Sequence, residues 1–242
     1  MRGMLFGVFS ALTYVFALQV TWIAFAKYDF AFPFWYEVLD IDEHIETYGP
    51  RNTIKRNFHL TAKQERLRLF NEINSAVHTR GAGLTDIYYY LPNGASLGRM
   101  LTAAEVQHLE DVGVLIAKLK TAGWWVTGAW ALLLLVSLAT ALRWPKIWHV
   151  AGLGFAVFGM LAAIIVVLGP VKVFYALHEW VFPKGHQWFF YYEESLMTML
   201  MKAPDLFGGI ALVLGTGSLL LWFALIAAVV TIARKSRRFI TP

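Results

Sequence analysis

The chain has 242 residues, of which 58% are hydrophobic and 15% are charged, with a formal net charge of +5. Soluble domains carry nearer a quarter of charged residues, so the composition indicates a membrane protein, and the positive charge does not by itself indicate nucleic-acid binding. The absence of cysteine excludes disulfides, cysteine-based metal sites and a cysteine nucleophile.

Four long stretches without charged residues predict four membrane-spanning helices. Each exceeds the roughly 20 residues that a helix needs to cross a bilayer core, and a lipid-exposed backbone must satisfy its own hydrogen bonds. We expect transmembrane helices at 1–27, 121–142, 147–171 and 206–233. The sequence AFA at 24–26 resembles a signal-peptidase site, but the apolar run before it is longer than a usual signal segment, so we expect the first span to be retained.

The segment 28–120 predicts a mostly helical extracytoplasmic domain inserted between spans 1 and 2. Pro33 and the pair at 49–50 argue against one continuous helix near its start. Aromatic residues there resemble those that gather at membrane interfaces. We therefore expect an interfacial belt made of Phe32, Phe34, Trp35 and Tyr36.

The sequence predicts two helices and a short strand within this domain. Thr61 with Gln64, and Thr102 with Glu105, have the spacing of capping boxes and predict two helix starts. The second of these helices runs toward span 2. Residues 87–91 favour a short strand, since the residues around them are typical of loops.

The remaining segments set the expected orientation. A turn at 143–146 joins spans 2 and 3, an aromatic extracytoplasmic or interfacial segment at 172–205 joins spans 3 and 4, and a tail follows at 234–242. The N-terminus, the turn and the tail together hold seven basic residues and no acidic one. Short basic segments stay in the cytoplasm, so both termini are expected there.

His108 stands out among the seven histidines. Glu105, His108 and Asp111 fall on one side of a helix. A carboxylate that orients an imidazole is a general-base arrangement, and either acid is placed to provide it. The alternative interpretation is an exposed helix face with ordinary charge pairs.

His178 and Glu179 follow the third span in an aromatic setting. Burial there would keep an imidazole neutral, which suits a base. Taken alone, the pattern favours the alternative of an amphipathic histidine at the interface. For the other five histidines a structural role is the simpler interpretation, and the last of them follows a probable turn: His44, His59, His78, His149 and His186.

The sequence lacks the common motifs of serine nucleophiles and of zinc hydrolases. The sequence contains neither a Gly-x-Ser-x-Gly elbow nor a His-Glu-x-x-His metal motif. A base-assisted direct attack is therefore the simpler chemistry.

Two segments resemble motifs of the bacterial lipoprotein intramolecular transacylase family. Residues 105–112 read EVQHLEDV, which resembles the family pattern E-x-x-H-[ML]-x-D-V. Residues 174–183 read FYALHEWVFP, which is similar to the family's F-H-x-x-F-F stretch after the third span, with Leu177 and Val181 in place of two phenylalanines. Four spans and a domain after the first one also agree.

The resemblance implies an acyltransferase of the bacterial cytoplasmic membrane with its active site on the extracytoplasmic face. Family members move the sn-2 acyl chain of a diacylated lipoprotein to the α-amine of its N-terminal cysteine, which gives a lyso-form lipoprotein. The catalytic candidates fall on His108 and His178, with support from Glu105, Asp111 and Glu179. The partners implied are the lipoprotein substrate and membrane lipid, and no cofactor, metal or nucleic acid is expected.

Three other interpretations remain open from the sequence. A haem- or metal-binding redox protein would need paired histidines, yet the only histidine within a span is His149. A metal-dependent membrane hydrolase would use His108, His178 and His186 with carboxylates. For a non-enzymatic scaffold, the histidines would be dispensable.

Overall fold

The computed structural model describes residues 2–139 and 147–240 and forms two compact units. Unit 1 comprises residues 1–24, 120–169 and 212–242, and unit 2 comprises residues 25–119 and 170–211. The predicted turn at 143–146 lies outside the described residues.

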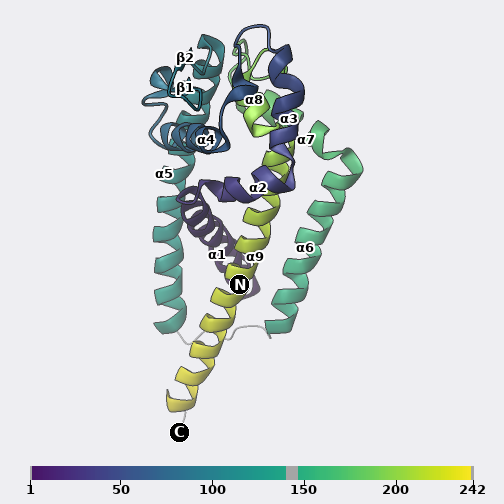
Figure 1. Ribbon diagram of the computed structural model, residues 1–242. Coiled ribbons are helices and arrows are strands. Elements are labelled where there is room, and N and C mark those ends of the chain that lie inside the picture. The colour runs from purple at the N-terminus through teal and green to yellow at the C-terminus, as the bar shows by residue number, and fades with distance from the viewer. Residues whose placement is uncertain (1, 140–146, 241–242) are drawn as a thin grey trace. The chain divides into compact units, whose positions relative to one another are not determined.

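Helices dominate both units (Figure 1). The α-helices are α1 (Arg2–Ala26), α2 (Phe32–Val38), α3 (Ile41–Tyr48), α4 (Lys63–His78), α5 (Ala103–Ala139), α6 (Ile147–Leu168), α7 (Pro170–Val181), α8 (Leu196–Met201) and α9 (Asp205–Ile240). Short 3-10 helices lie at Asp29–Ala31, Gly49–Arg51, Phe58–Leu60 and Leu84–Asp86, and the strands β1 (Tyr88–Tyr90) and β2 (Ser96–Arg99) pair antiparallel.

Four helices of the described chain are long and apolar enough to cross a membrane. They are α1, α5, α6 and α9, over Met4–Ala26, Ala103–Ala139, His149–Leu168 and Asp205–Ala233. The four predicted spans therefore correspond to four observed helices. Two helices end elsewhere than predicted. The third stops at Leu168 and not at 171, because Gly169 adopts a φ of 91° and Pro170 follows it. The fourth continues beyond 233 into the predicted tail.

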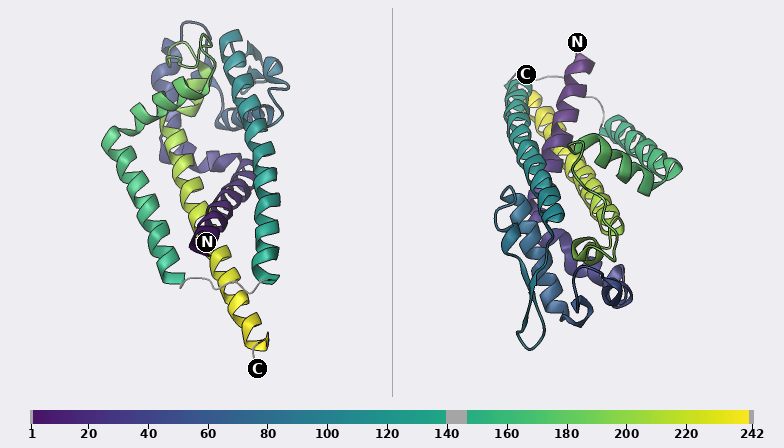
Figure 2. Two further views of the ribbon diagram at one scale, coloured as in Figure 1. Left: turned by 180° about the vertical axis from the view of Figure 1, so that it is seen from behind. Right: turned by 90° about the horizontal axis from the view of Figure 1, so that it is seen from above.

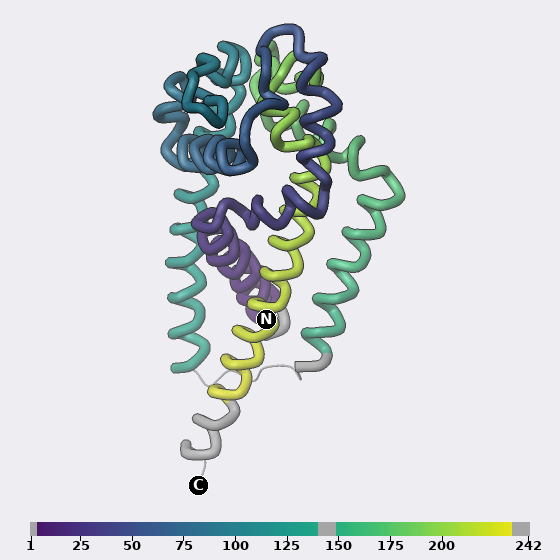
Figure 3. The backbone as a smooth tube through the Cα atoms, in the orientation of Figure 1, coloured from purple at the N-terminus to yellow at the C-terminus, as the bar shows by residue number. Residues whose placement is uncertain are grey.

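Helix α5 belongs to both units and appears as one uninterrupted helix in Figure 3. Its 37 residues extend roughly 55 Å at 1.5 Å per residue, well beyond a bilayer core of about 30 Å. All its charged side chains precede Thr121. The charge-free part, 121–139, is the part of α5 whose composition suits a bilayer core.

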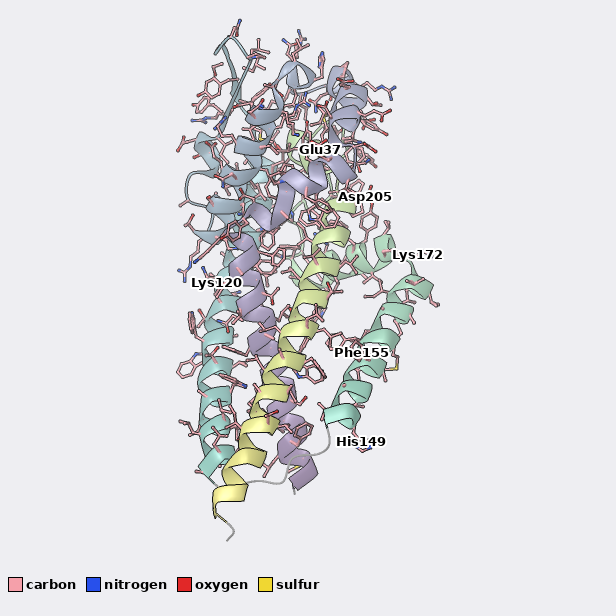
Figure 4. All side chains as sticks on the ribbon, turned by 60° about the horizontal axis from the view of Figure 1, so that its bottom comes forward. Glu37, Lys120, His149, Phe155, Lys172 and Asp205 are labelled. Atoms are coloured by element: carbon pink, nitrogen blue, oxygen red, sulfur yellow. The ribbon has the colours of Figure 1, made fainter. Side chains whose placement is uncertain are left out.

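Aromatic and polar contacts join the helices of unit 1, which Figure 2 shows from two further sides. The rings of Phe16 on α1 and Trp130 on α5 stack at 4.3 Å, and Trp222 on α9 donates its indole N–H to the Ser10 carbonyl at 3.0 Å. Buried apolar residues from α1, α6 and α9 complete the core. Figure 4 locates Phe155 along α6.

The start of unit 2 packs inward, which corrects the predicted interfacial belt. Phe32, Trp35 and Tyr36 are buried, and only Phe34 is exposed. Phe32 stacks on Phe70 of α4 at 3.8 Å. Aromatic residues suit a lipid interface and a protein core equally well, so their composition could not decide between the two.

Helix α4 is held by Arg66, whose side chain is 3% exposed. Its guanidinium donates to the Tyr36 hydroxyl, to Asp42 and to the His59 carbonyl. The predicted capping box of this helix is wrong: α4 begins at Lys63, and Thr61 donates its hydroxyl to the Phe58 carbonyl instead. The expected strand near 87–91 is confirmed as β1.

We expect the substitution Arg66→Met to destabilise unit 2. The change leaves the buried Tyr36 hydroxyl and the His59 carbonyl without their donor, at a cost of about 2–4 kcal/mol. Thermal unfolding in detergent, followed by tryptophan fluorescence, should show a lower midpoint than for the exposed control Arg56→Met. Equal midpoints would contradict a structural role for Arg66.

Candidate active site

A capping box formed by Thr102 and Glu105 fixes the start of α5, as predicted. The Thr102 backbone N–H donates to Glu105 Oε2 at 2.6 Å, and the Glu105 backbone N–H donates to Thr102 Oγ1 at 3.3 Å. These bonds satisfy donors that the first turn of a helix leaves free. Since residues three apart share a helix face, Glu105, His108 and Asp111 form one row along α5.

Glu105 joins the start of α5 to the start of α8. Its side chain is 1% exposed, and Oε1 accepts from the Ser195 hydroxyl at 2.5 Å and from the Met197 backbone N–H at 3.4 Å. Ser195 in turn caps α8 by accepting from the Thr198 backbone N–H at 2.9 Å. Glu105 therefore bonds to Ser195, and not to the imidazole of His108 as the spacing suggested.

His108 and His178 lie beside each other, one on α5 and one on α7. Their ring centroids are 6.1 Å apart, and Phe182 contacts both rings at centroid distances of 4.9 and 5.2 Å. His108 is 8% exposed. Two histidines that are 70 positions apart in sequence thus converge within unit 2.

Three further aromatic rings lie next to the two imidazoles. Phe174 lies 4.0 Å and Trp188 5.1 Å from the His178 ring, measured between centroids, and the buried Phe190 lies 6.1 Å from the His108 ring. These apolar neighbours limit the access of water to both imidazoles.

The tautomer of His178 follows from its hydrogen bond. Nδ1 lies 2.8 Å from the Phe174 carbonyl oxygen, and a carbonyl can only accept. Nδ1 of the neutral ring therefore carries the hydrogen, which leaves Nε2 with a lone pair. His178 thus presents an acceptor nitrogen, the form needed to take up a proton.

Both imidazoles favour the neutral state. Burial, and then the neighbouring His178, lower the pKa of His108 to about 4. Burial also lowers the pKa of His178, and this effect exceeds the opposing one of the Phe174 carbonyl. At neutral pH the pair can therefore accept and donate hydrogen bonds without carrying charge.

Asp111 pairs with a histidine that the sequence pattern did not favour. Its Oδ2 lies 2.6 Å from Nδ1 of His186, with side chains 20% and 35% exposed. The expectation that Asp111 would hold His108 is thus not met, because the loop after α7 brings His186 to the carboxylate. Glu179, the third supporting candidate, is exposed on α7.

Two further histidines have other surroundings. His44 is buried against Tyr192 at 4.4 Å, and burial followed by Lys202 lowers its pKa to about 4. His149 is exposed on α6 (Figure 4). In the part of the chain that the structure describes, no three histidine, aspartate or glutamate side chains are grouped as for a metal ion.

Sequence reasoning missed the contribution of the segment after α7. Phe182, Trp188 and Phe190 surround the imidazoles, and Ser195 binds Glu105. The aromatic composition of this segment was a visible signal. Ser195 directly before an apolar run was a further signal, typical of a helix N-cap.

We expect the His108 ring to titrate near pH 4, since burial disfavours its charged form. Its NMR signals, followed from pH 3 to pH 8, should show this midpoint in the wild-type chain, and the substitution Phe190→Ala should raise it by admitting water. A wild-type midpoint at the ordinary histidine value of about 6.5 would contradict the buried placement.

Comparisons with known proteins identify the family of the chain. The family model described as lipoprotein intramolecular transacylase Lit matches residues 5–203, which confirms the resemblance seen in the two motifs. No curated protein matches the chain.

Two similar solved structures are of the membrane integral lipoprotein intramolecular transacylase Lit from Bacillus cereus. One has a TM-score of 0.69 and 15% identity, covering 98% of this chain and 98% of that chain. The other carries a histidine-to-arginine mutation and has a TM-score of 0.68 and 13% identity, covering 98% and 94%. At these identities they show a shared fold. Because the family match includes both histidine segments and most of the chain, the chain belongs to the lipoprotein intramolecular transacylase Lit family of membrane acyltransferases.

Proposed function

We propose that this chain moves the sn-2 acyl chain of a diacylated lipoprotein to the α-amine of its N-terminal cysteine, giving a lyso-form lipoprotein. The observation that supports this reaction best is the pair of neutral imidazoles, 6.1 Å apart and enclosed by aromatic rings. The pair offers one proton acceptor and one hydrogen-bond donor to a single reacting centre. Acyl transfer needs both.

His178 is the general base in this mechanism, because its free Nε2 carries the lone pair. The substrate amine attacks the ester carbonyl carbon, a C–N bond forms, and Nε2 takes the proton from nitrogen. When the intermediate collapses, the bond between the carbonyl carbon and the sn-2 oxygen breaks. His178 then returns the proton to that oxygen, so the enzyme ends the cycle unchanged.

His108 stabilises the oxyanion that forms during the attack. A neutral imidazole carries one N–H, and a donor aimed at a developing negative charge is most effective where water is excluded. The burial of His108 meets that condition. Its pKa of about 4 keeps the ring neutral at working pH, so the protonation of the substrate amine, with a pKa of about 7.7–8.0, limits the reaction on the acidic side.

The reaction needs neither an acyl-enzyme nor a cofactor. The amine and the ester belong to one molecule, and such tethering gives a large effective molarity once the two groups are aligned. The chain has no cysteine, and its sequence lacks a serine elbow. A direct transfer uses only the two imidazoles.

We further propose that the segments 28–120 and 172–205 lie on the extracytoplasmic face of the bacterial cytoplasmic membrane, and that both termini lie in the cytoplasm. The basic residues of the N-terminus, of 143–146 and of 234–242 support this orientation. The ester of a membrane-anchored lipoprotein would then meet the histidine pair at headgroup depth.

We expect His108→Asn and His178→Asn each to lower the transfer rate by about 10²–10⁴-fold, the usual contribution of acid–base groups. Mass spectrometry of a diacylated lipopeptide should show one chain moved to the amine at unchanged total mass with the wild-type chain, and little movement with either variant. His44→Asn is the matched control, since His44 is as buried as His108 but lies outside the pair. Full activity of both single variants would remove the catalytic assignment.

A further inference from the structure

The row on α5 meets the segment 182–195, here called the cover segment, at three points in reverse order. Glu105 bonds to Ser195, His108 faces Phe190 at 6.1 Å, and Asp111 bonds to His186 at 2.6 Å. The chemistry-bearing histidine is therefore the middle contact, and a carboxylate anchors the cover segment on each side of it.

The two anchors differ in exposure. Glu105 and Ser195 are 1% and 0% exposed, and the carboxylate accepts from several donors, so this end is built into the core of unit 2. Asp111 and His186 are partly exposed and are joined by one contact between two side chains. The second anchor is the weaker one and the one that a substitution can release.

Between the anchors, the cover segment has little structure of its own. Residues 187–191 form neither helix nor strand. The hydrogen bonds from Asn52 and Thr53 reach only the Tyr192 and Glu193 carbonyls that follow them. The segment nevertheless carries three of the rings that surround the imidazoles, Phe182, Trp188 and Phe190. Phe182 follows α7 directly, and its backbone N–H donates to the His178 carbonyl. Trp188 and Phe190 lie between the two anchors, so their positions depend on where the segment is anchored.

We propose that Asp111 and His186 are positioning residues, which hold the cover segment against α5 so that its aromatic rings keep water away from the histidine pair. This inference rests on the proposed transacylase function. Glu105 and Ser195 hold the far end of the same segment. The side chains of Asp111 and His186 act through the rings that they place, and exchange no proton with the substrate.

If the cover segment keeps water out, displacing it should change the reaction products. The ester carbonyl that the amine attacks is also open to water, which would break the same bond between the carbonyl carbon and the sn-2 oxygen. That reaction releases a free fatty acid, and the sn-2 oxygen gains a proton. A displaced cover segment should therefore shift the products from transfer toward hydrolysis, which simple loss of folded protein would not do.

Exchanging the two side chains tests positioning directly. Asp111→His alone and His186→Asp alone place like groups opposite each other, and we expect each to lower the transfer rate by about tenfold to a hundredfold with more fatty acid released per turnover. The double variant Asp111→His/His186→Asp restores an imidazole–carboxylate pair in reverse, and should recover most of the transfer. Lys184→Ala, an exposed change in the same segment, should behave as wild type.

Asp111→Asn provides a second variant of nearly the same shape. Its amide oxygen can still accept from the His186 ring, so it should retain more transfer than Asp111→His. Rates, product ratios and unfolding midpoints are measured in detergent with a diacylated lipopeptide.

Two outcomes would overturn the proposal: single variants with wild-type transfer, or an exchanged pair that folds normally but stays as inactive as the single variants. The second outcome would mean that one side chain handles a proton from a fixed position. If the wild-type chain transfers the acyl chain and His108→Asn and His178→Asn do not, either outcome rejects the anchor alone. A wild-type chain that transfers no acyl chain to the amine would instead reject the proposed function itself.

Discussion

The arrangement of the site depends on the buried carboxylate of Glu105. It caps the first turn of α5 through Thr102 and accepts from Ser195 at the start of α8. Burying a carboxylate without hydrogen-bond partners would cost folding free energy. Glu105 can therefore be buried here only because these donors bind it. The result is a hydrogen-bonded junction between α5 and α8, one helical turn before His108.

The fold and the site differ in how far the sequence could predict them. Long apolar stretches and the capping box at Thr102 depend on neighbours in sequence, and both were predicted correctly. The pairing of Asp111 with His186 joins positions 75 apart, and spacing along α5 alone wrongly favoured His108 as the partner. The inward packing of Phe32 was missed for a related reason, since composition does not distinguish a protein neighbour from lipid.

Unit 2 places its two central imidazoles in surroundings that disfavour charge. Burial lowers the pKa of both rings, which weakens them as bases in isolation. In the proposed transfer the substrate compensates for this, because its amine becomes far more acidic once it has attacked the carbonyl and carries positive charge. A weakly basic imidazole that remains neutral is therefore suited to a transfer in which the nucleophile and the ester arrive on one molecule.

The most direct test of the central claim is whether the side chains at positions 108 and 178 meet in the protein in solution. The chain has no cysteine, so the double variant His108→Cys/His178→Cys carries the only two thiols, and a short bifunctional thiol reagent reports their proximity by mass. The account predicts one intramolecular bridge, formed more slowly when lyso-form lipopeptide is bound. Thiols that each react with a small monofunctional reagent but never become bridged would contradict it.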